Sequence, residues 1–139
     1  MAEVNPYLTF VSNCEEAFNF YKAVFQREFL TLMRFGDVPS DYQSAESESH
    51  KIMHVALPLG KNSVLMGSDT PEGMGKVIQG TNLSIAIETE TEDEATRLFN
   101  GLAIDGTVTM PLGKVFWGAY FGMLTDKFGT QWLVSYTYK

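Results

Sequence analysis

Residues 5–21, Asn-Pro-Tyr-Leu-Thr-Phe-Val-Ser-Asn-Cys-Glu-Glu-Ala-Phe-Asn-Phe-Tyr, decide the fold, because residues 82–99 repeat their order of signals. In each stretch a short strand pattern runs into a helix pattern, and further strand patterns follow. The repeat predicts an α+β fold of two βαβββ modules whose sheets form an open cleft for a small molecule. We expect one domain, 1–139, with module 1 at about 1–70, a linker at about 71–81 and module 2 at about 82–139.

Capping signals place one helix in each module. Asn13 is followed three residues later by Glu16, and Thr91 likewise by Glu94. Each pair predicts a capping box, at the start of helices at about 13–26 and 91–102. Apolar runs and turn signals predict strands at 5–11, 29–35, 52–59, 63–67, 83–87, 108–110, 121–125 and 131–138. The serine-rich residues 40–50 are expected to form an exposed loop.

Composition narrows the class of protein. The hydrophobic fraction of 45% with 19% charged residues is typical of a globular domain with a core. A net charge of −7 disfavours nucleic acid and anionic membrane as partners, because both present phosphate. The single cysteine, Cys14, excludes an intrachain disulfide and suits a reducing compartment. Without a signal-peptide pattern or a long apolar run, a cytoplasmic protein is expected.

Several blocks of sequence resemble a known family over nearly the whole chain. They lie at 5–10, 17–21, 51–55, 64–69, 107–112 and 116–132. The last block is the most specific, since several aromatic residues and glycines must match in order. The chain resembles the PhnB-like branch of the glyoxalase/bleomycin-resistance/dioxygenase (vicinal oxygen chelate) superfamily. The resemblance implies paired βαβββ modules, a homodimer, and in many members a divalent metal held by histidine and glutamate. Proteins of this branch have often carried a methyltransferase label.

The resemblance also allows the metal to be tested position by position. The residues at the superfamily's four ligand positions are Pro6, Leu65, Asn82 and Leu133. A placement slipped by one or two residues offers instead Tyr7, Met66, Ser84 or Val134. None of these provides the imidazole or carboxylate donors that a divalent metal needs. We therefore expect no metal and no other cofactor.

Two kinds of reactive side chain are candidates for chemistry. His54 lies in a predicted strand, where it would act as a general base or hydrogen-bond partner, or would be a half-buried structural histidine. No acidic residue close in sequence orients it, which favours the structural interpretation. His50 is expected to be solvated. Cys14 begins a helix, which lowers a thiol pKa, but Glu15 and its acidic neighbour oppose this effect, so a structural role is expected.

Aromatic and methionine side chains suggest a pocket that takes a flat or cationic ligand. The candidate ligand-binding residues are Tyr7, Met53, Met66, Ser68, Phe116, Trp117, Tyr120, Thr125 and Trp132. The alternative is that some of them are simply core residues. For Trp117 and Tyr120, a pocket wall and a dimer interface are both consistent with the pattern. Thr125 and Ser68 would offer hydroxyl groups to a ligand or satisfy the backbone.

Three functions remain open at this point. The first is a metal-independent protein that binds a small aromatic or cationic molecule. The second is a metal-dependent or acid/base enzyme of lyase, isomerase or dioxygenase type that uses His54. The third is the methyltransferase label, which has little support, because no glycine-rich loop joins a strand to a helix as S-adenosylmethionine enzymes of the common kind require. A homodimer is expected in each case, because apolar side chains exposed on sheet edges favour association.

Overall fold

The computed structural model describes residues 2–38 and 48–139. Most of the loop predicted at 40–50 falls outside these residues. The chain divides into two compact units, Met1–Ile78 and Gln79–Lys139, which we call unit 1 and unit 2.

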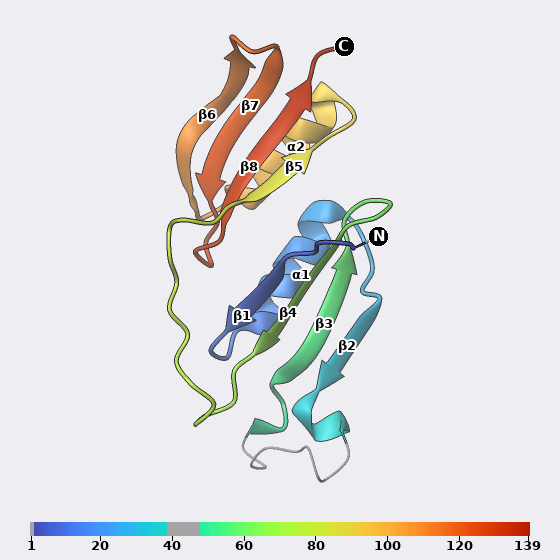
Figure 1. Cartoon of the computed structure of the whole chain (residues 1–139), viewed down its shortest axis with the longest axis vertical. Coiled ribbons are helices and arrows are strands. Elements are labelled where there is room, and N and C mark those ends of the chain that lie inside the picture. Colours follow the sequence, from blue (N-terminus) through green and yellow to red (C-terminus); the bar gives the residue numbers. More distant parts are fainter. Residues whose placement is uncertain (1, 39–47) are drawn as a thin grey trace. The chain divides into compact units, whose positions relative to one another are not determined.

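Unit 1 is a four-stranded sheet covered on one face by a helix (Figure 1). Its elements are β1 (Tyr7–Phe10), α1 (Cys14–Phe25), β2 (Thr31–Arg34), the short 3-10 helix η1 (Phe35–Asp37), β3 (Ile52–Pro58) and β4 (Val64–Asp69). The strand order is β1-β4-β3-β2, and β1 runs parallel to β4 whereas the other pairs are antiparallel. The first strand therefore pairs with the last one.

Unit 2 repeats this path. Its elements are β5 (Ile85–Glu88), α2 (Glu92–Leu102), β6 (Thr107–Val115), β7 (Ala119–Thr125) and β8 (Gln131–Thr137). The strand order is β5-β8-β7-β6, with β5 parallel to β8. The predicted α+β fold of two βαβββ modules is confirmed. The predicted cleft between the modules stays a prediction.

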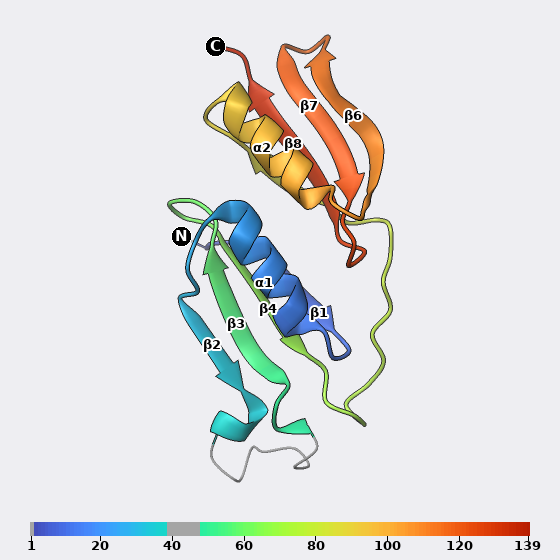
Figure 2. The ribbon, with the colours of Figure 1, turned by 180° about the vertical axis from the view of Figure 1, so that it is seen from behind.

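Each helix covers one face of its own sheet and leaves the other face open (Figures 1 and 2). In unit 1 Phe18 and Tyr21 of α1 are fully buried, and their rings meet edge to face with centroids 5.5 Å apart. Gly67 of β4 makes room for Phe18, because a Cβ there would lie 2.7 Å from the ring carbon Cε1. Gly67 and its alternate neighbour Leu65 therefore face α1.

In unit 2 a glycine likewise makes room for an aromatic ring of the helix, but on a different strand. A Cβ on Gly122 of β7 would lie 2.7 Å from Cε2 of Phe99 in α2, so Gly122 faces the helix. Its register partner on β8 is Val134, and the next pair along is Leu124 with Trp132. All three of these larger side chains are buried, which places the core of unit 2 between α2 and this face.

The two helices are capped differently. The capping box predicted at Thr91 is present, since the Thr91 hydroxyl accepts from the backbone N–H of Glu94 at 3.0 Å, while the Glu94 carboxylate accepts from the N–H of Glu90. The capping box predicted at Asn13 is wrong: Asn13 occupies the N-cap position but makes no side-chain capping bond. The carboxylate of Asp69 takes that role, accepting from the N–H of Cys14 at 2.9 Å.

One strand is longer than the sequence pattern predicts. A strand was expected at 108–110, followed by an irregular stretch, but β6 extends over nine residues to Val115. Its pairing with β7 shifts register twice, which admits Pro111 and Gly113 without ending the strand. β6 is at the sheet edge and Pro111 falls within a register shift, two settings in which a strand tolerates proline. Among the described residues, no helix has the length and hydrophobicity needed to span a membrane.

Candidate functional site

The open face of unit 1 collects four of the residues that the sequence analysis selected. Because Gly67 and Leu65 face α1, their neighbours Met66 and Ser68 project from the opposite face of β4. Parallel pairing places Tyr7 of β1 beside Met66. His54 belongs to the same face, because it alternates with the buried, helix-facing Val55, whose partner is Gly67.

The rings of Tyr7 and His54 meet across the middle of this face. Their centroids are 6.0 Å apart and their planes differ by 29°, which is a stacked arrangement. β4 lies between β1 and β3 in the sheet, so the strands that carry the two rings are about 9.6 Å apart, two strand spacings, and His54 lies two residues along β3 from the position level with Tyr7. The rings therefore lean towards each other over β4, above the strand that carries Met66 and Ser68.

The polar atoms of this face have no partners within the described chain. The side chains of Tyr7, His54 and Ser68 form no hydrogen bond to any described residue. No fully buried side-chain nitrogen or oxygen of the described residues is unsatisfied, so the nitrogens of the half-buried His54 are open to solvent. Tyr7 is 47% exposed. A hydroxyl, a phenol and an imidazole are thus available to a molecule that lies on the sheet.

Sequence reasoning missed two residues of this face. Thr9 pairs with Ser68, and Met33 of β2 pairs with His54. Strand alternation from Tyr7 would have indicated Thr9. No local signal indicates Met33, because the pairing of β2 with β3 shifts register just beyond it. Met53 lies at that same irregularity, beside the pair of Ile52 with Arg34, and is partly exposed.

Unit 2 presents a different set of predicted residues. Phe116 and Trp117 lie in the turn between β6 and β7, with 96% and 53% of their surface exposed. Their rings are perpendicular with centroids 5.0 Å apart, and Trp117 also meets Phe121 at 5.5 Å and 67°. Thr125 ends β7 and pairs with Gln131 and with Thr107.

Trp132 and Tyr120 belong instead to the helix side of unit 2. Trp132 is completely buried, and its indole N–H donates to Oδ2 of Asp126 at 2.8 Å. The hydroxyl of Tyr120 lies 3.2 Å from that of Thr96 in α2. These contacts fit the alternative that the two residues belong to the core, and neither is part of the candidate site.

Cys14 is placed where a thiol is inert. Its side chain has no exposed surface. Burial raises the pKa of the thiol well above its usual range, and the nearby charges of Asp69 and Glu15 raise it further. The helix N-terminus does not compensate for these effects, so the thiolate is inaccessible at neutral pH. The structural role expected for Cys14 fits this environment.

The positions aligned with the superfamily's metal ligands do not share one face of the sheets: some lie on the helix-covered face and others on the open face. Leu65 is fully buried against α1, so the placement of a ligand position there is wrong for a site on the open face. The slipped pair Tyr7 and Met66 lies on the open face, offering a phenol and a thioether. In unit 2 Leu133 lies on the open face, between helix-facing neighbours. No group of three His, Cys, Asp or Glu in the described chain is arranged to hold a metal ion.

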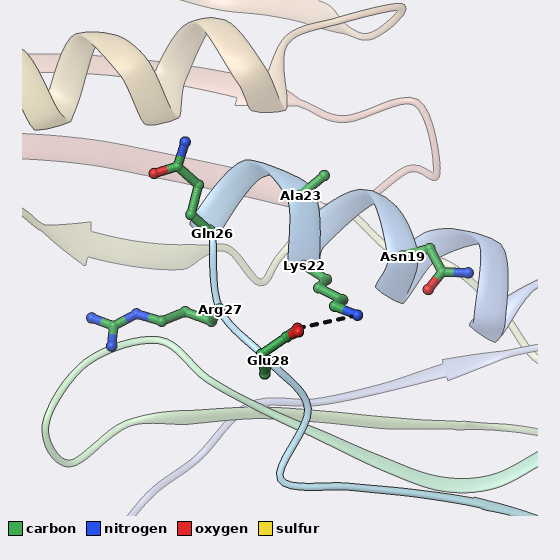
Figure 3. A pocket seen from close by; sticks show the side chains of 6 residues that line it. All are labelled: Asn19, Lys22, Ala23, Gln26, Arg27 and Glu28. Atoms are coloured by element: carbon green, nitrogen blue, oxygen red, sulfur yellow. Dashed lines mark ion pairs between the residues drawn. The ribbon is translucent and has the colours of Figure 1, made fainter.

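Two shallow grooves lie on the outer surfaces of the helices. One, of about 390 Å³, follows the end of α1 and is lined by Asn19, Lys22, Ala23, Gln26, Arg27 and Glu28 (Figure 3). The Lys22 ammonium is already engaged there, by Glu28 at 3.2 Å and by the ring of Phe29. The other, of about 400 Å³, borders the acidic first turn of α2. Neither groove gathers the unpartnered polar groups found on the open face of unit 1.

Comparison with known proteins places the chain in a family. The family model described as 3-demethylubiquinone-9 3-methyltransferase matches residues 2–135. The chain belongs to this family. The crystal structure of protein PA1353 from Pseudomonas aeruginosa, 38% identical with both chains covered in full, superposes on this chain with a TM-score of 0.87. The Bacillus cereus structure described as a putative 3-demethylubiquinone-9 3-methyltransferase, PhnB protein, is 27% identical over 98% of this chain and 100% of that one, with a TM-score of 0.76.

More distant structures share the fold alone. A glyoxylase/bleomycin resistance protein/dioxygenase domain from Frankia sp. EAN1pec is 11% identical over all of this chain and 94% of that one, with a TM-score of 0.68. The expected relation to PhnB proteins is confirmed, and so is the glyoxalase/bleomycin-resistance fold. The word methyltransferase appears here only in the description of the family model and in that of the Bacillus cereus structure, where it is marked putative. Neither described sheet is doubly wound and parallel, the arrangement in which common nucleotide-cofactor enzymes bind their cofactor.

Proposed function

We propose that this member of the 3-demethylubiquinone-9 3-methyltransferase family is a binding protein for a small, flat organic molecule, held without a metal on the open face of unit 1. One observation carries the proposal. Tyr7, His54 and Ser68 converge on this face with no hydrogen-bond partner among the described residues, beside the apolar Met66.

The chemistry of the face suits an aromatic ligand. Ring stacking contributes about 0.5–1.5 kcal/mol beyond burial of apolar area, and a methionine adapts to irregular ligand shapes. The imidazole and the hydroxyls then fix the orientation of polar substituents. Tyr7, Thr9, His54, Met66 and Ser68 include no carboxylate, lysine or arginine. A neutral aromatic compound with a polar edge therefore fits better than a strongly charged one.

Titration with 2-naphthol, followed by two-dimensional NMR of the labelled protein, tests this proposal. Saturable shifts centred on the amides of β1, β3 and β4 are expected, and cyclohexanol, which lacks a π face, should bind more weakly. Tyr7→Leu should weaken 2-naphthol binding about threefold to tenfold through the lost stacking. Tyr138→Leu is the matched control in unit 2. Equal affinities for the two compounds, or shifts confined to other elements, would sink the proposal.

A second candidate function is catalysis with His54 as general base. The observation that favours it is that both imidazole nitrogens of the half-buried ring are unpaired and open to solvent. No described carboxylate orients the ring, so the gain expected from such a base is at the low end, about a hundredfold. Turnover of a bound compound that His54→Phe abolishes, with binding retained, would establish catalysis. If the parent protein and His54→Phe both bind the compound and neither converts it, catalysis is ruled out and the binding function stands.

A further inference from the structure

A second aromatic arrangement, separate from the open face of unit 1, stands on the β6–β7 hairpin of unit 2. We call Phe116, Trp117 and Phe121 the aromatic corner. Trp117 is its centre. The ring centroid of Phe116 lies 5.0 Å from that of Trp117 with the planes at 89°, and the centroid of Phe121 lies 5.5 Å away with the planes at 67°. Both contacts are edge-to-face, so the ring faces turned away from a neighbouring ring meet no other ring of the corner. Exposure of 96% for Phe116 and 53% for Trp117 leaves such faces open to solvent.

The backbone that carries these rings is held in one conformation. Gly118 has a φ of +83°, which a residue with a side chain rarely adopts, and it closes the three-residue turn. Its N–H donates to the carbonyl of Val115 at 3.2 Å, and its carbonyl accepts from the N–H of Tyr138 at 2.9 Å. The turn is therefore tied both to its own hairpin and to the chain leaving β8. Ligand binding would therefore cost little conformational entropy at this backbone.

The electrostatics of the corner favour a cation. The face of an aromatic ring carries negative charge density, and a face-on cation is attracted to it. Within the described residues of unit 2, Lys114 lies over the ring of Tyr138 and Lys127 over that of Phe128. No lysine of these residues lies over the three rings of the corner. Lys114, on the same hairpin, is the one placed over Tyr138, at 5.5 Å. The net charge of −7 adds a long-range attraction for cations.

We propose that the aromatic corner binds an organic ammonium ion of the quaternary class. Such an ion is weakly hydrated and has no N–H to donate, so ring faces recognise it without a carboxylate. The corner supplies ring faces, which match that ligand, and its one polar side-chain group is the indole N–H of Trp117, a donor that a quaternary ammonium does not use. The inference does not depend on the proposed function, because no residue is shared with the open face of unit 1.

Choline and its neutral isostere 3,3-dimethyl-1-butanol distinguish cation binding from hydrophobic contact. The readout is the amide signal of Gly118 in two-dimensional NMR, with sodium chloride matching the ionic strength. Saturable shifts with choline are expected, and the isostere should bind about fivefold more weakly. Trp117 fluorescence gives an independent signal, because the other tryptophan, Trp132, is completely buried. Equal affinities for the two compounds would overturn the proposal.

Variants separate this site from the other one. Phe116→Leu should weaken choline binding about threefold, and Val108→Ala, an exposed position of β6, should leave it unchanged. Tyr7→Leu should also leave it unchanged, so failure here is distinguishable from failure of the unit 1 proposal. Light scattering tests the alternative that the corner is a contact with a second copy of the chain. If the protein is a dimer, if Phe116→Asp disrupts that dimer, and if choline binds neither the dimer nor the monomer, the proposal is wrong.

Discussion

The two units follow the same chain path but use their buried carboxylates for different purposes. In unit 1 Asp69, at the end of β4, accepts from the N–H of Cys14 and from the N–H of Ile52, both at 2.9 Å. In unit 2 Asp126 organises a local turn and holds the indole of Trp132. The helix of unit 2 is capped by Thr91, three residues from its bonding partner. Topology therefore does not dictate how a helix end is satisfied, and unit 1 depends more on a single distant side chain.

The largest expected effect is the loss of that side chain. Asp69→Ala leaves two buried N–H groups without acceptors, and we expect a loss of about 3 kcal/mol in the free energy of unfolding. Urea unfolding followed by circular dichroism measures it. Asp69→Asn, which keeps one accepting oxygen, should lose less. A loss for Asp69→Ala no greater than that of Thr91→Ala would contradict the dependence of unit 1 on a long-range cap.

The glycines that face the helices sharpen the comparison, because both units rely on them. Gly122→Ala would bring a methyl group to 2.9 Å from Cα of Leu112 and 2.7 Å from Phe99. We expect a destabilisation of about 2 kcal/mol, typical of overpacking. Gly67→Ala, with the carbonyl oxygen of Leu8 at 2.8 Å, should behave alike. Gly113→Ala, which meets nothing within 4 Å, is the control. Thermal unfolding that ranks Gly113→Ala with the other two would refute this account.

The helix caps give a smaller difference between the units. Thr91→Ala removes a capping hydrogen bond and should cost about 1 kcal/mol. Asn13→Ala removes no capping bond and should change the free energy of unfolding by less than about 0.5 kcal/mol. Amide hydrogen exchange in the first turn of each helix locates the effect. Comparable losses for the two substitutions would show that Asn13 caps α1 in solution.

The smallest effect concerns pH and the ion pair of unit 1. Arg34 binds both oxygens of Glu15, and these hydrogen bonds hold the pKa of that carboxyl below its usual 4.5. Because the folded pKa is the lower one, the pair stabilises the protein above about pH 4.5 and its contribution is lost as pH falls further. Both side chains are partly exposed, so Glu15→Gln should cost less than about 1 kcal/mol at pH 7. Unfolding curves at pH 7 and pH 3 should differ less in the variant than in the parent protein.

Local patterns in the sequence were sufficient for several features. The repeated order of signals predicted two βαβββ modules, and the spacing of Thr91 and Glu94 predicted a capping box, because both depend on residues within a few positions of each other. The strand predicted at 63–67 ends before Asp69, and no local pattern marks that residue as a helix cap. Its role depends on a partner 55 residues away, and no local rule reports such a contact.

The candidate site shows the same division. Sequence selected Tyr7, His54, Met66 and Ser68, but it also selected Trp132, which the structure buries beneath α2. An aromatic residue in a strand points to one face or the other, and only the pairing register decides which face the helix covers. The same register brought in Thr9 and Met33.

The sequence by itself determined the α+β class, the two modules, the positions of both helices and the resemblance to the PhnB-like branch. These follow from short-range periodicity and from ordered motifs that survive without knowledge of contacts. The tertiary structure alone decided that Tyr7 and His54 meet over β4, that Asp69 caps α1, and that Phe116 and Trp117 stand in solvent. Each of these depends on strand register and helix packing between segments far apart in the chain, which the cooperative packing of the whole unit fixes.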